Sequence, residues 1–332
     1  MSTRLRNLFF LLGIACIVVM VVSFDLSLTS ITDNLARAGR WFFIACALWA
    51  AVYTLNAIGW YAIIHDGSTA QRIPFWRVLK YTVTGFALNT VTPVGLMGGE
   101  PYRIMELKPY VGIERATSST LLYVMMHIFS HFWYWLLSVG IYIFAYHESL
   151  TPEMGMLLLA TTIICSTGIY LFARGYRSGF TRSALRLLTH VPYIKKWATR
   201  FSNDKQDTLQ RIDQQIAQLH STRQRTFGLA LSCELLARIL SSVELVIFLQ
   251  IFGINASLAD GILMLGFTSL FANAMFFLPM QLGAREGGFA MAAGGLAIGT
   301  GIGVSVGLLI RLRELVCTIV GIGIMKIGNN FR

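Results

Sequence analysis

The segment "NTVTPVGLMGGEPYRIMELK" (Asn89–Lys108) places two prolines, three glycines, two glutamates and an arginine between two apolar runs. Proline and glycine both disfavour a helix interior, and charged side chains are costly at membrane depth. A linker would account for the glycines alone. A functional site would account for the glutamate at Glu100 as well, and the remainder of the sequence discriminates between these two interpretations.

The composition is that of a polytopic membrane protein. Of the 332 residues, 55% are hydrophobic and only 13% are charged, whereas soluble domains carry about 25% charged residues. Six apolar runs approach or exceed the roughly 20 residues that a membrane-spanning helix needs. These runs are Leu8–Phe24, Trp41–Ile64, Ala116–Tyr146, Met154–Ala173, Phe227–Phe252 and Gly303–Met325.

The placement of charge predicts the orientation in the membrane. The segment Arg174–Arg200 holds seven lysines and arginines and no acid, whereas residues 147–153 hold two glutamates and no lysine or arginine. Because cytoplasmic loops are enriched in lysine and arginine, we expect the first loop inside and the second outside, with both termini in the cytoplasm. Basic loops beside a membrane usually meet anionic lipid headgroups, so no nucleic-acid partner is predicted.

Threading the chain between these loops predicts an all-α polytopic protein with about six transmembrane helices and two re-entrant helical hairpins. The segment Phe75–Arg115 must leave and return on the cytoplasmic side, since too few uncharged residues follow Lys80 to cross. The segment Ser257–Gly299 would enter from outside, although its first limb, Gly261–Leu278, has eighteen uncharged residues and could just span. We expect one integral membrane domain over residues 1–332, with a first repeat at about 41–147, a basic loop at about 174–225 and a second repeat at about 226–326.

The tips of the two hairpins resemble each other. "PVGLMGGE" (Pro93–Glu100) and "PMQLGARE" (Pro279–Glu286) both place a glutamate seven residues after a proline. The two units enter from opposite faces, so they form an inverted repeat. Inverted repeats with broken elements near the bilayer midplane are typical of secondary transporters, and the broken elements mark the binding site.

These tips, "TPVGLMGGEPYR" and "LPMQLGAREGGFAM", together with "VGLLIRLREL" further on, resemble the lysylphosphatidylglycerol synthase transmembrane region, a flippase-like family. The resemblance covers roughly Trp41 to Lys326. It implies that a phospholipid or polyprenyl-linked lipid moves between leaflets of the bacterial cytoplasmic (inner) membrane. Larger members also carry a soluble aminoacyl-transfer domain, which we do not expect here because the chain ends at Arg332. The helix after the first tip, "LLYVMMHIFSH", lacks an arginine that this family often has there.

Charged residues in and after the second tip are the first candidates for a lipid-binding site. Arg285 and Glu286 lie where a helix begins, and unpaired N–H groups at such an end, with an arginine, suit a phosphate. The alternative is that they only lock the tip into the bundle. Arg311 can pair with Glu314, three residues further along the helix, or it can bind a lipid phosphate. Glu244, on the preceding transmembrane helix, is the predicted counter-ion of Arg311.

His127 precedes Arg313 by 186 residues, the offset that also separates Glu100 from Glu286, so it is a candidate basic group of the first repeat. His127 and His131 have a spacing that zinc ligands use, but no glutamate or cysteine accompanies them, so no metal site and no cofactor are predicted. Glu234 and Arg238, four residues apart, are expected to pair with each other. The predicted binding and gating residues are Arg285, Glu286, Glu100, Arg311, Glu244, Arg313, Glu314, Pro93, Gly98, Gly99, Pro279, Gly283 and His127.

The function predicted from the sequence is translocation of an anionic lipid. Membrane lipids with an anionic headgroup would be the partners, and a homo-oligomer is possible. A membrane-embedded glycosyl- or aminoacyl-lipid transferase is the first alternative, because glutamates in a polar cavity can act as a general base. The second alternative is a scaffold for a separate lipid-modifying enzyme that docks on the loop at 174–225. No nucleotide-hydrolysis, serine-hydrolase or metalloprotease motif occurs in the chain.

Overall fold

The computed structural model describes residues 36–65, 73–92, 98–147, 150–178, 214, 224–275, 281 and 283–326. Secondary structure within these ranges is helical throughout, which confirms the all-α prediction. Several predictions concern residues outside the described ranges. These are the first apolar run (Leu8–Phe24), the tip prolines Pro93 and Pro279, and most of the basic loop at 174–225.

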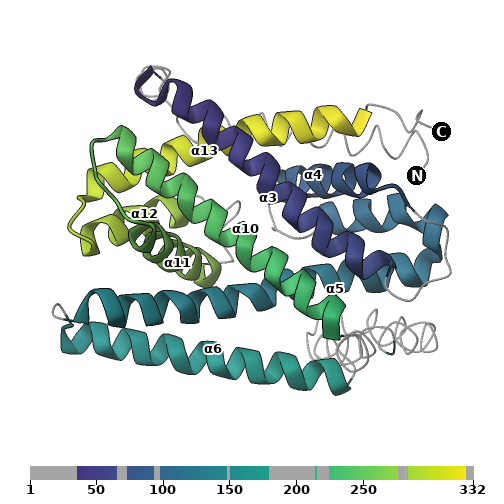
Figure 1. Ribbon diagram of the computed structural model, residues 1–332, viewed down its shortest axis with the longest axis horizontal. Helices are drawn as coiled ribbons and strands as arrows, with labels where there is room; N and C mark the ends of the chain where they lie inside the picture. Colours follow the sequence, from purple (N-terminus) through teal and green to yellow (C-terminus); the bar gives the residue numbers. More distant parts are fainter. Residues whose placement is uncertain are drawn as a thin grey trace, which may run out of the picture.

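Eight helices can be followed along the described part of the chain (Figure 1). The first half contains α3 (Arg40–His65), α4 (Phe75–Val91), α5 (Gly99–Ala145) and α6 (Pro152–Ser178), and the second contains α10 (Gln224–Ile251), α11 (Leu258–Ala274), α12 (Ala284–Gly295) and α13 (Thr300–Lys326).

Three helical segments within the described residues are long and apolar enough to cross a membrane: α3, α5 and the Pro152–Arg174 part of α6. The helices α10 and α13 have 28 and 27 residues, but charged side chains interrupt their apolar sequence near the middle. The helix α11 is apolar and has only 17 residues, fewer than the roughly 20 that a span needs. The sequence left open whether this limb spans, and the hairpin stays a prediction.

The long helix α5 is kinked near its beginning. Gly112 has φ 78° and ψ 166°, a conformation that side chains with a β-carbon rarely adopt. The kink separates a short limb, residues 99–111, from the long apolar part of the helix. The second half has the same arrangement, because a turn at 296–299 separates the 12-residue α12 from α13.

The contacts between helices repeat from one half to the other. The helices α3 and α10 run side by side across the molecule, and each packs against the short helix that follows it, α4 or α11 (Figure 1). The short helix α4 also packs on α13, while α11 packs on α5. Each short helix therefore contacts the long helix of the other half, so the two halves interlock.

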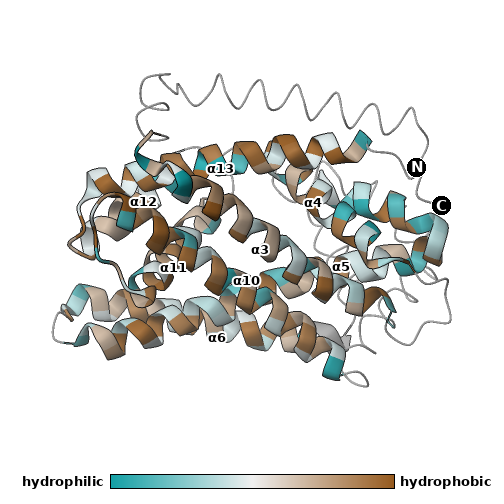
Figure 2. Cartoon of the chain, turned by 45° about the horizontal axis from the view of Figure 1, so that its top comes forward, coloured by the Kyte–Doolittle hydropathy of each residue, from teal (hydrophilic) through white to brown (hydrophobic). Residues whose placement is uncertain are grey.

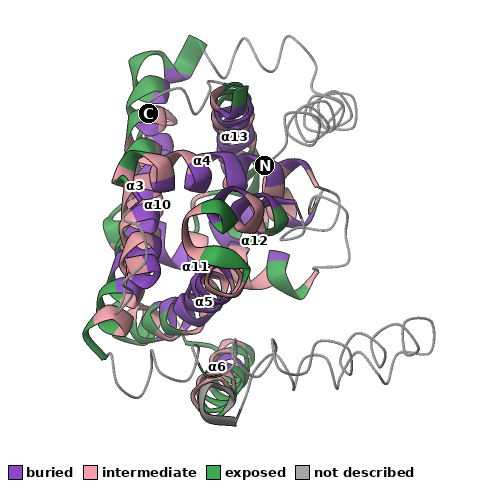
Figure 3. Ribbon diagram, turned by 90° about the vertical axis from the view of Figure 1, so that its right-hand side faces the viewer, coloured by how far each residue is buried: buried purple, intermediate pink, exposed green. Residues whose placement is uncertain are grey.

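The exterior of the bundle is apolar, and its interior contains charge. Large hydrophobic side chains are exposed along α6, including Leu159, Ile163 and Leu171, whereas Arg103, Arg313 and other ionisable residues are buried. Figure 2 shows hydrophobic colour over most of the helices, and Figure 3 shows α6 as a largely exposed helix beside a buried centre. This is the reverse of a soluble domain, and it is the arrangement expected in lipid.

Candidate functional site

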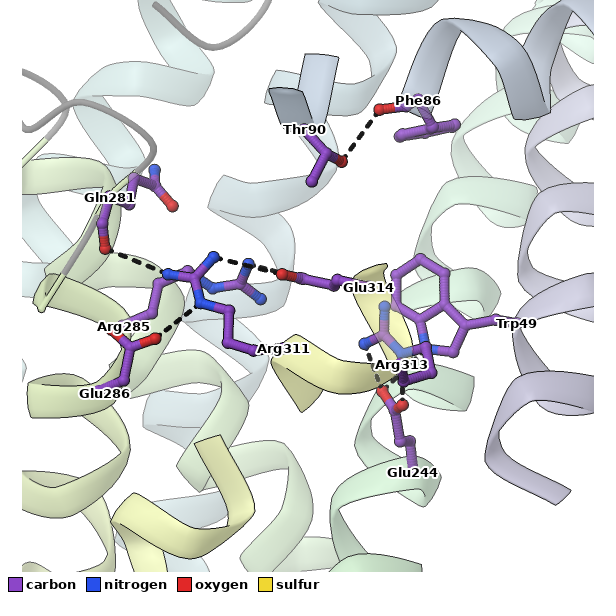
Figure 4. Close-up of polar contacts among 10 residues, drawn as sticks. All are labelled: Trp49, Phe86, Thr90, Glu244, Gln281, Arg285, Glu286, Arg311, Arg313 and Glu314. Atoms are coloured by element: carbon purple, nitrogen blue, oxygen red, sulfur yellow. Dashed lines mark hydrogen bonds and ion pairs between the residues drawn. The ribbon is translucent and has the colours of Figure 1, made fainter. Parts of the chain in front are cut away.

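The start of α12 and the middle of α13 together form a cluster of four charged residues, here called the C-terminal ion cluster: Arg285, Glu286, Arg311 and Glu314. Arg285 Nη1 lies 2.5 Å from Glu314 Oε1, and Arg311 Nε lies 2.6 Å from Glu286 Oε1 (Figure 4). Arg311 Nη1 also lies 3.3 Å from Glu314 Oε2, so the predicted pair of Arg311 with Glu314 is confirmed. Opposite charges on α12 and α13 thus join the second tip to the helix that follows it.

The same cluster holds the backbone of the second tip. The N–H of Gly283 donates to Glu286 Oε2 at 3.0 Å, and Arg311 Nη2 donates to the carbonyl oxygen of Gln281 at 3.3 Å. Gly283 has φ 76°, a left-handed conformation that favours glycine. In this conformation of the protein the charges fasten the tip to α13, which is the structural role that the sequence left open beside phosphate binding.

Arg313, two residues after Arg311, belongs to a separate and more buried pair. Its guanidinium donates to Glu244 of α10 with two bonds, of 2.7 Å and 2.9 Å, and lies 3.8 Å from the centre of the Trp49 ring. The indole of Trp49 donates to Glu244 Oε2 at 2.8 Å. Both charged side chains retain only 2% exposure.

The prediction that Glu244 is the counter-ion of Arg311 is therefore wrong. Residues two apart on a helix point in nearly opposite directions, since each residue advances about 100° around the axis. Arg311 accordingly faces the tip of α12, while Arg313 faces α10 and α3.

The formal charges of the C-terminal ion cluster and of the neighbouring Glu244–Arg313 pair sum to zero. Three arginines face three glutamates, and every one of these carboxylates has both oxygens bonded. Exposure rises toward the tip, from 6% for Arg311 and 13% for Glu314 to 19% for Glu286 and 26% for Arg285. A ligand that reaches the region would therefore meet Arg285 and Glu286 first.

A second group of residues, here called the N-terminal polar cluster, combines four residues of α5 with one of α10: Glu100, Arg103, Tyr123, His127 and Glu234. Glu100 Oε1 accepts from Arg103 Nη1 at 3.1 Å and from Asn89 Nδ2 at 2.9 Å. The Arg103 guanidinium is 1% exposed and lies 5.0 to 5.8 Å from the rings of Tyr123, Phe86 and Trp60. Such rings attract a cation through their negative faces.

Sequence reasoning missed Arg103. The signal was present in "GGEPYR", where an arginine follows the tip glutamate by three residues, a spacing that brings two side chains together on a helix. The first half therefore has a buried arginine on the short limb, although the span after it has none.

Two glycines bring the first tip close to α4. A β-carbon on Gly99 would lie 2.8 Å from the carbonyl carbon of Gly85 and 2.9 Å from Asn89 Oδ1, and one on Gly98 would lie 2.8 Å from the Leu88 carbonyl oxygen. The N–H of Gly99 donates to Asn89 Oδ1 at 2.7 Å. The role that the structure shows for Gly98 and Gly99 is thus close packing, which any larger residue would prevent.

His127 connects α5 to α10. Its Nδ1 lies 2.8 Å from Glu234 Oε2, while Arg238 donates to Ser130 Oγ at 2.8 Å and to the His127 carbonyl oxygen at 2.7 Å. The hydrogen bonds of Glu234 and Arg238 thus run to α5 instead of to each other, which corrects the predicted internal pair. Both side chains lie on the face of α10 that packs against α5, where each meets a partner.

His127 and Arg313 each bind a carboxylate of α10, Glu234 and Glu244 respectively. The tip glutamates, by contrast, lie in separate clusters: Glu100 bonds to residues of the first half and Glu286 to residues of the second. Within the described ranges, no three histidine, cysteine or acidic side chains are placed to hold a metal ion.

An apolar exterior, helices long enough to cross a bilayer and buried ionised side chains together define an integral membrane protein. The family model described as "Lysylphosphatidylglycerol synthase TM region" matches residues 10–321, and the chain belongs to that family. This match confirms the resemblance noted in the sequence. Comparisons with curated proteins and with solved structures gave no match.

Proposed function

We propose that this protein is a flippase-like lipid translocase, which moves an anionic phospholipid or polyprenyl-linked lipid between the leaflets of the bacterial inner membrane. The observation that carries the proposal is the C-terminal ion cluster, because it places two arginines at the start of a helix inside an apolar bundle. Ionisable groups at membrane depth usually mark a substrate or ion pathway. Membership of the family supports a lipid as the substrate.

The proposed topology has six spans, two re-entrant hairpins that form an inverted repeat, and both termini in the cytoplasm. The short lengths of α4, α11 and α12, of 17, 17 and 12 residues, support hairpin limbs that do not cross. The interlocking contacts of α4 with α13 and of α11 with α5 support the repeat. The hairpin tips would then meet near the bilayer midplane, where transporters of this design bind their substrates.

The substrate phosphate would replace Glu314. Arg285 and Arg311 both donate to this carboxylate, so a phosphate that enters between them can accept the same bonds. Such an exchange leaves neither arginine without a partner, and the cost falls instead on the displaced Glu314 carboxylate, which loses both of its bonds. The free N–H groups at the start of α12 would add to phosphate binding.

Replacement of Glu314 would also loosen the tip. Arg285 belongs to α12 and Glu314 to α13, so their bond fastens one element to the other. When a phosphate takes that bond, the tip keeps the bonds of Arg311 to Glu286 and to the Gln281 carbonyl oxygen. In this scheme substrate binding itself opens the gate, with Glu286 and Glu100 as the gating carboxylates of the two tips.

The experiment is leaflet exchange of labelled lipids in proteoliposomes that contain the purified protein. Arg285→Ala removes a proposed phosphate ligand, and Arg225→Ala, which changes an exposed arginine at the start of α10, is the matched control. We expect exchange of labelled phosphatidylglycerol to fall about tenfold or more in Arg285→Ala and to stay unchanged in Arg225→Ala, as for the loss of one charge-assisted bond. Equal exchange in both variants would refute the assignment of the site.

A further inference from the structure

Buried polar atoms without a partner are concentrated around the N-terminal polar cluster. Among the described residues, Trp60 Nε1, Glu100 Oε2, Arg103 Nε, Tyr123 OH and Glu234 Oε1 are buried and make no hydrogen bond. Each such atom has lost its hydration without gaining a bond, and native proteins leave few of them. Several unpartnered polar atoms in one place therefore indicate a site that can bind a further polar group or a proton.

Tyr123 lies at the centre of this site. Its ring is 5.0 Å from the Arg103 guanidinium and 5.7 Å from the ring of Trp60. Arg103 is bonded to Glu100, and His127, four residues after Tyr123 on the same helix, is bonded to Glu234. The unpartnered atoms thus belong to one continuous polar region between α3, α5 and α10.

Five carboxylates lie in or beside the two clusters, and they differ in how many oxygens are bonded. Glu244, Glu286 and Glu314 have both oxygens bonded to donors that keep their protons, namely arginines, the Trp49 indole and the Gly283 N–H, so neither oxygen is open to a proton. Glu100 and Glu234 each have one buried oxygen without a partner. A buried, unbonded carboxylate oxygen is a position where a proton lowers the cost of burial.

Glu100 and Glu234 differ in the residue to which their bonded oxygen is attached by a hydrogen bond. Glu100 is bonded to Arg103, and an arginine keeps its charge under all physiological conditions. Glu234 is bonded to His127, and histidine is the side chain that exchanges a proton between pH 5 and 8. His127 keeps 29% of its side chain exposed while Glu234 keeps 3%, so the histidine is the accessible member of the pair.

We propose that Glu234, together with His127, is a proton-binding site. A proton enters at the His127 ring, and the Nδ1 proton can pass to Glu234 Oε2 across their hydrogen bond, so the pair gains one proton in total. The charged or titratable groups around the pair are Glu100, Arg103, Tyr123 and His131 of α5 and Cys233 and Arg238 of α10, while α3 contributes the neutral Asn56 and Trp60.

Charge balance suggests a use for this proton. Glu100, Glu234, Arg103 and Arg238 sum to zero when charged, so one added proton makes the region positive by one unit. A lipid phosphate carries one negative charge, so the movement of lipid and proton together is electroneutral across the low-dielectric bilayer. This use rests on the proposed function, whereas the binding of the proton does not.

Proton binding is tested by infrared difference spectroscopy of the full-length protein between pH 5 and pH 8. We expect a carboxyl C=O band at the lower pH that is lost in Glu234→Gln and retained in Glu100→Gln. Glu153→Gln, at an exposed position in the first turn of α6, is the control that should leave the band unchanged. His127→Asn should shift the midpoint of the titration. A band that persists in Glu234→Gln, or that is missing from the unmodified protein, overturns the proposal.

The coupling of proton movement to lipid movement is tested in the same proteoliposomes with a pH gradient across the membrane. We expect a gradient of one unit to shift labelled lipid between leaflets by up to about tenfold, the limit for one proton per lipid, and we expect no shift in Glu234→Gln. Loss of the infrared band without a gradient effect would keep the proton site and reject the coupling. If no leaflet exchange occurs at all, the proposed function fails while the infrared result still stands.

Discussion

Glu244→Gln removes the charge from the most buried ion pair of the second half. Glu244 and Arg313 are each 2% exposed, and the arginine donates two bonds to this carboxylate. Loss of one partner of a buried pair costs about 3–5 kcal/mol, since the other charge is left uncompensated. Glutamine keeps one acceptor oxygen, so we expect about 3 kcal/mol, which corresponds to a fall in Tm on the order of 5–10 °C.

Glu286→Gln is the matched control for this prediction. Glu286 is 19% exposed, and its partner Arg311 keeps a second carboxylate in Glu314. We expect a loss of about 1 kcal/mol and a shift in Tm of a few degrees.

The assay is heating in detergent micelles followed by size-exclusion chromatography of the protein that remains folded. The double variant Glu244→Leu with Arg313→Met should recover most of the lost stability, because apolar residues of similar volume often replace a buried ion pair without loss. Equal Tm values for Glu244→Gln and Glu286→Gln would refute the reasoning. The reasoning would also be refuted if the double variant lost as much stability as Glu244→Leu alone and Arg313→Met alone lose together.

Three further predictions concern the tips and the clusters. Glu314→Gln removes the carboxylate that Arg285 and Arg311 share, so native mass spectrometry should show several-fold more bound anionic lipid; unchanged binding would contradict the exchange with phosphate. Gly99→Ala would place a methyl group against the backbone of α4 and lower stability by about 1–3 kcal/mol, whereas Gly287→Ala, with nothing within 4 Å, should cost little; equal thermal stability would refute the close packing. Arg103→Lys should lower thermal stability more than Arg225→Lys does, because a lysine cannot stack on the three rings as a guanidinium does; equal effects would argue against the aromatic contacts.

The sequence by itself determined the helical membrane class, and it predicted the pairing of Arg311 with Glu314 as one of two alternatives. Both depend on local signals. Hydropathy reflects the number of apolar residues in a run, proline and glycine mark where a helix stops, and residues three apart on a helix are neighbours. The family resemblance depended on similarly short motifs and was confirmed over residues 10–321.

Only the tertiary structure decided which charges meet across helices. Glu244 bonds to Arg313 instead of Arg311, and Glu234 bonds to His127 with no hydrogen bond to Arg238. Such pairs depend on how far each helix is rotated about its axis and how far it is shifted along its neighbour. Packing sets both quantities, for example where Gly99 allows the first tip to approach α4, and no local pattern in the sequence records them.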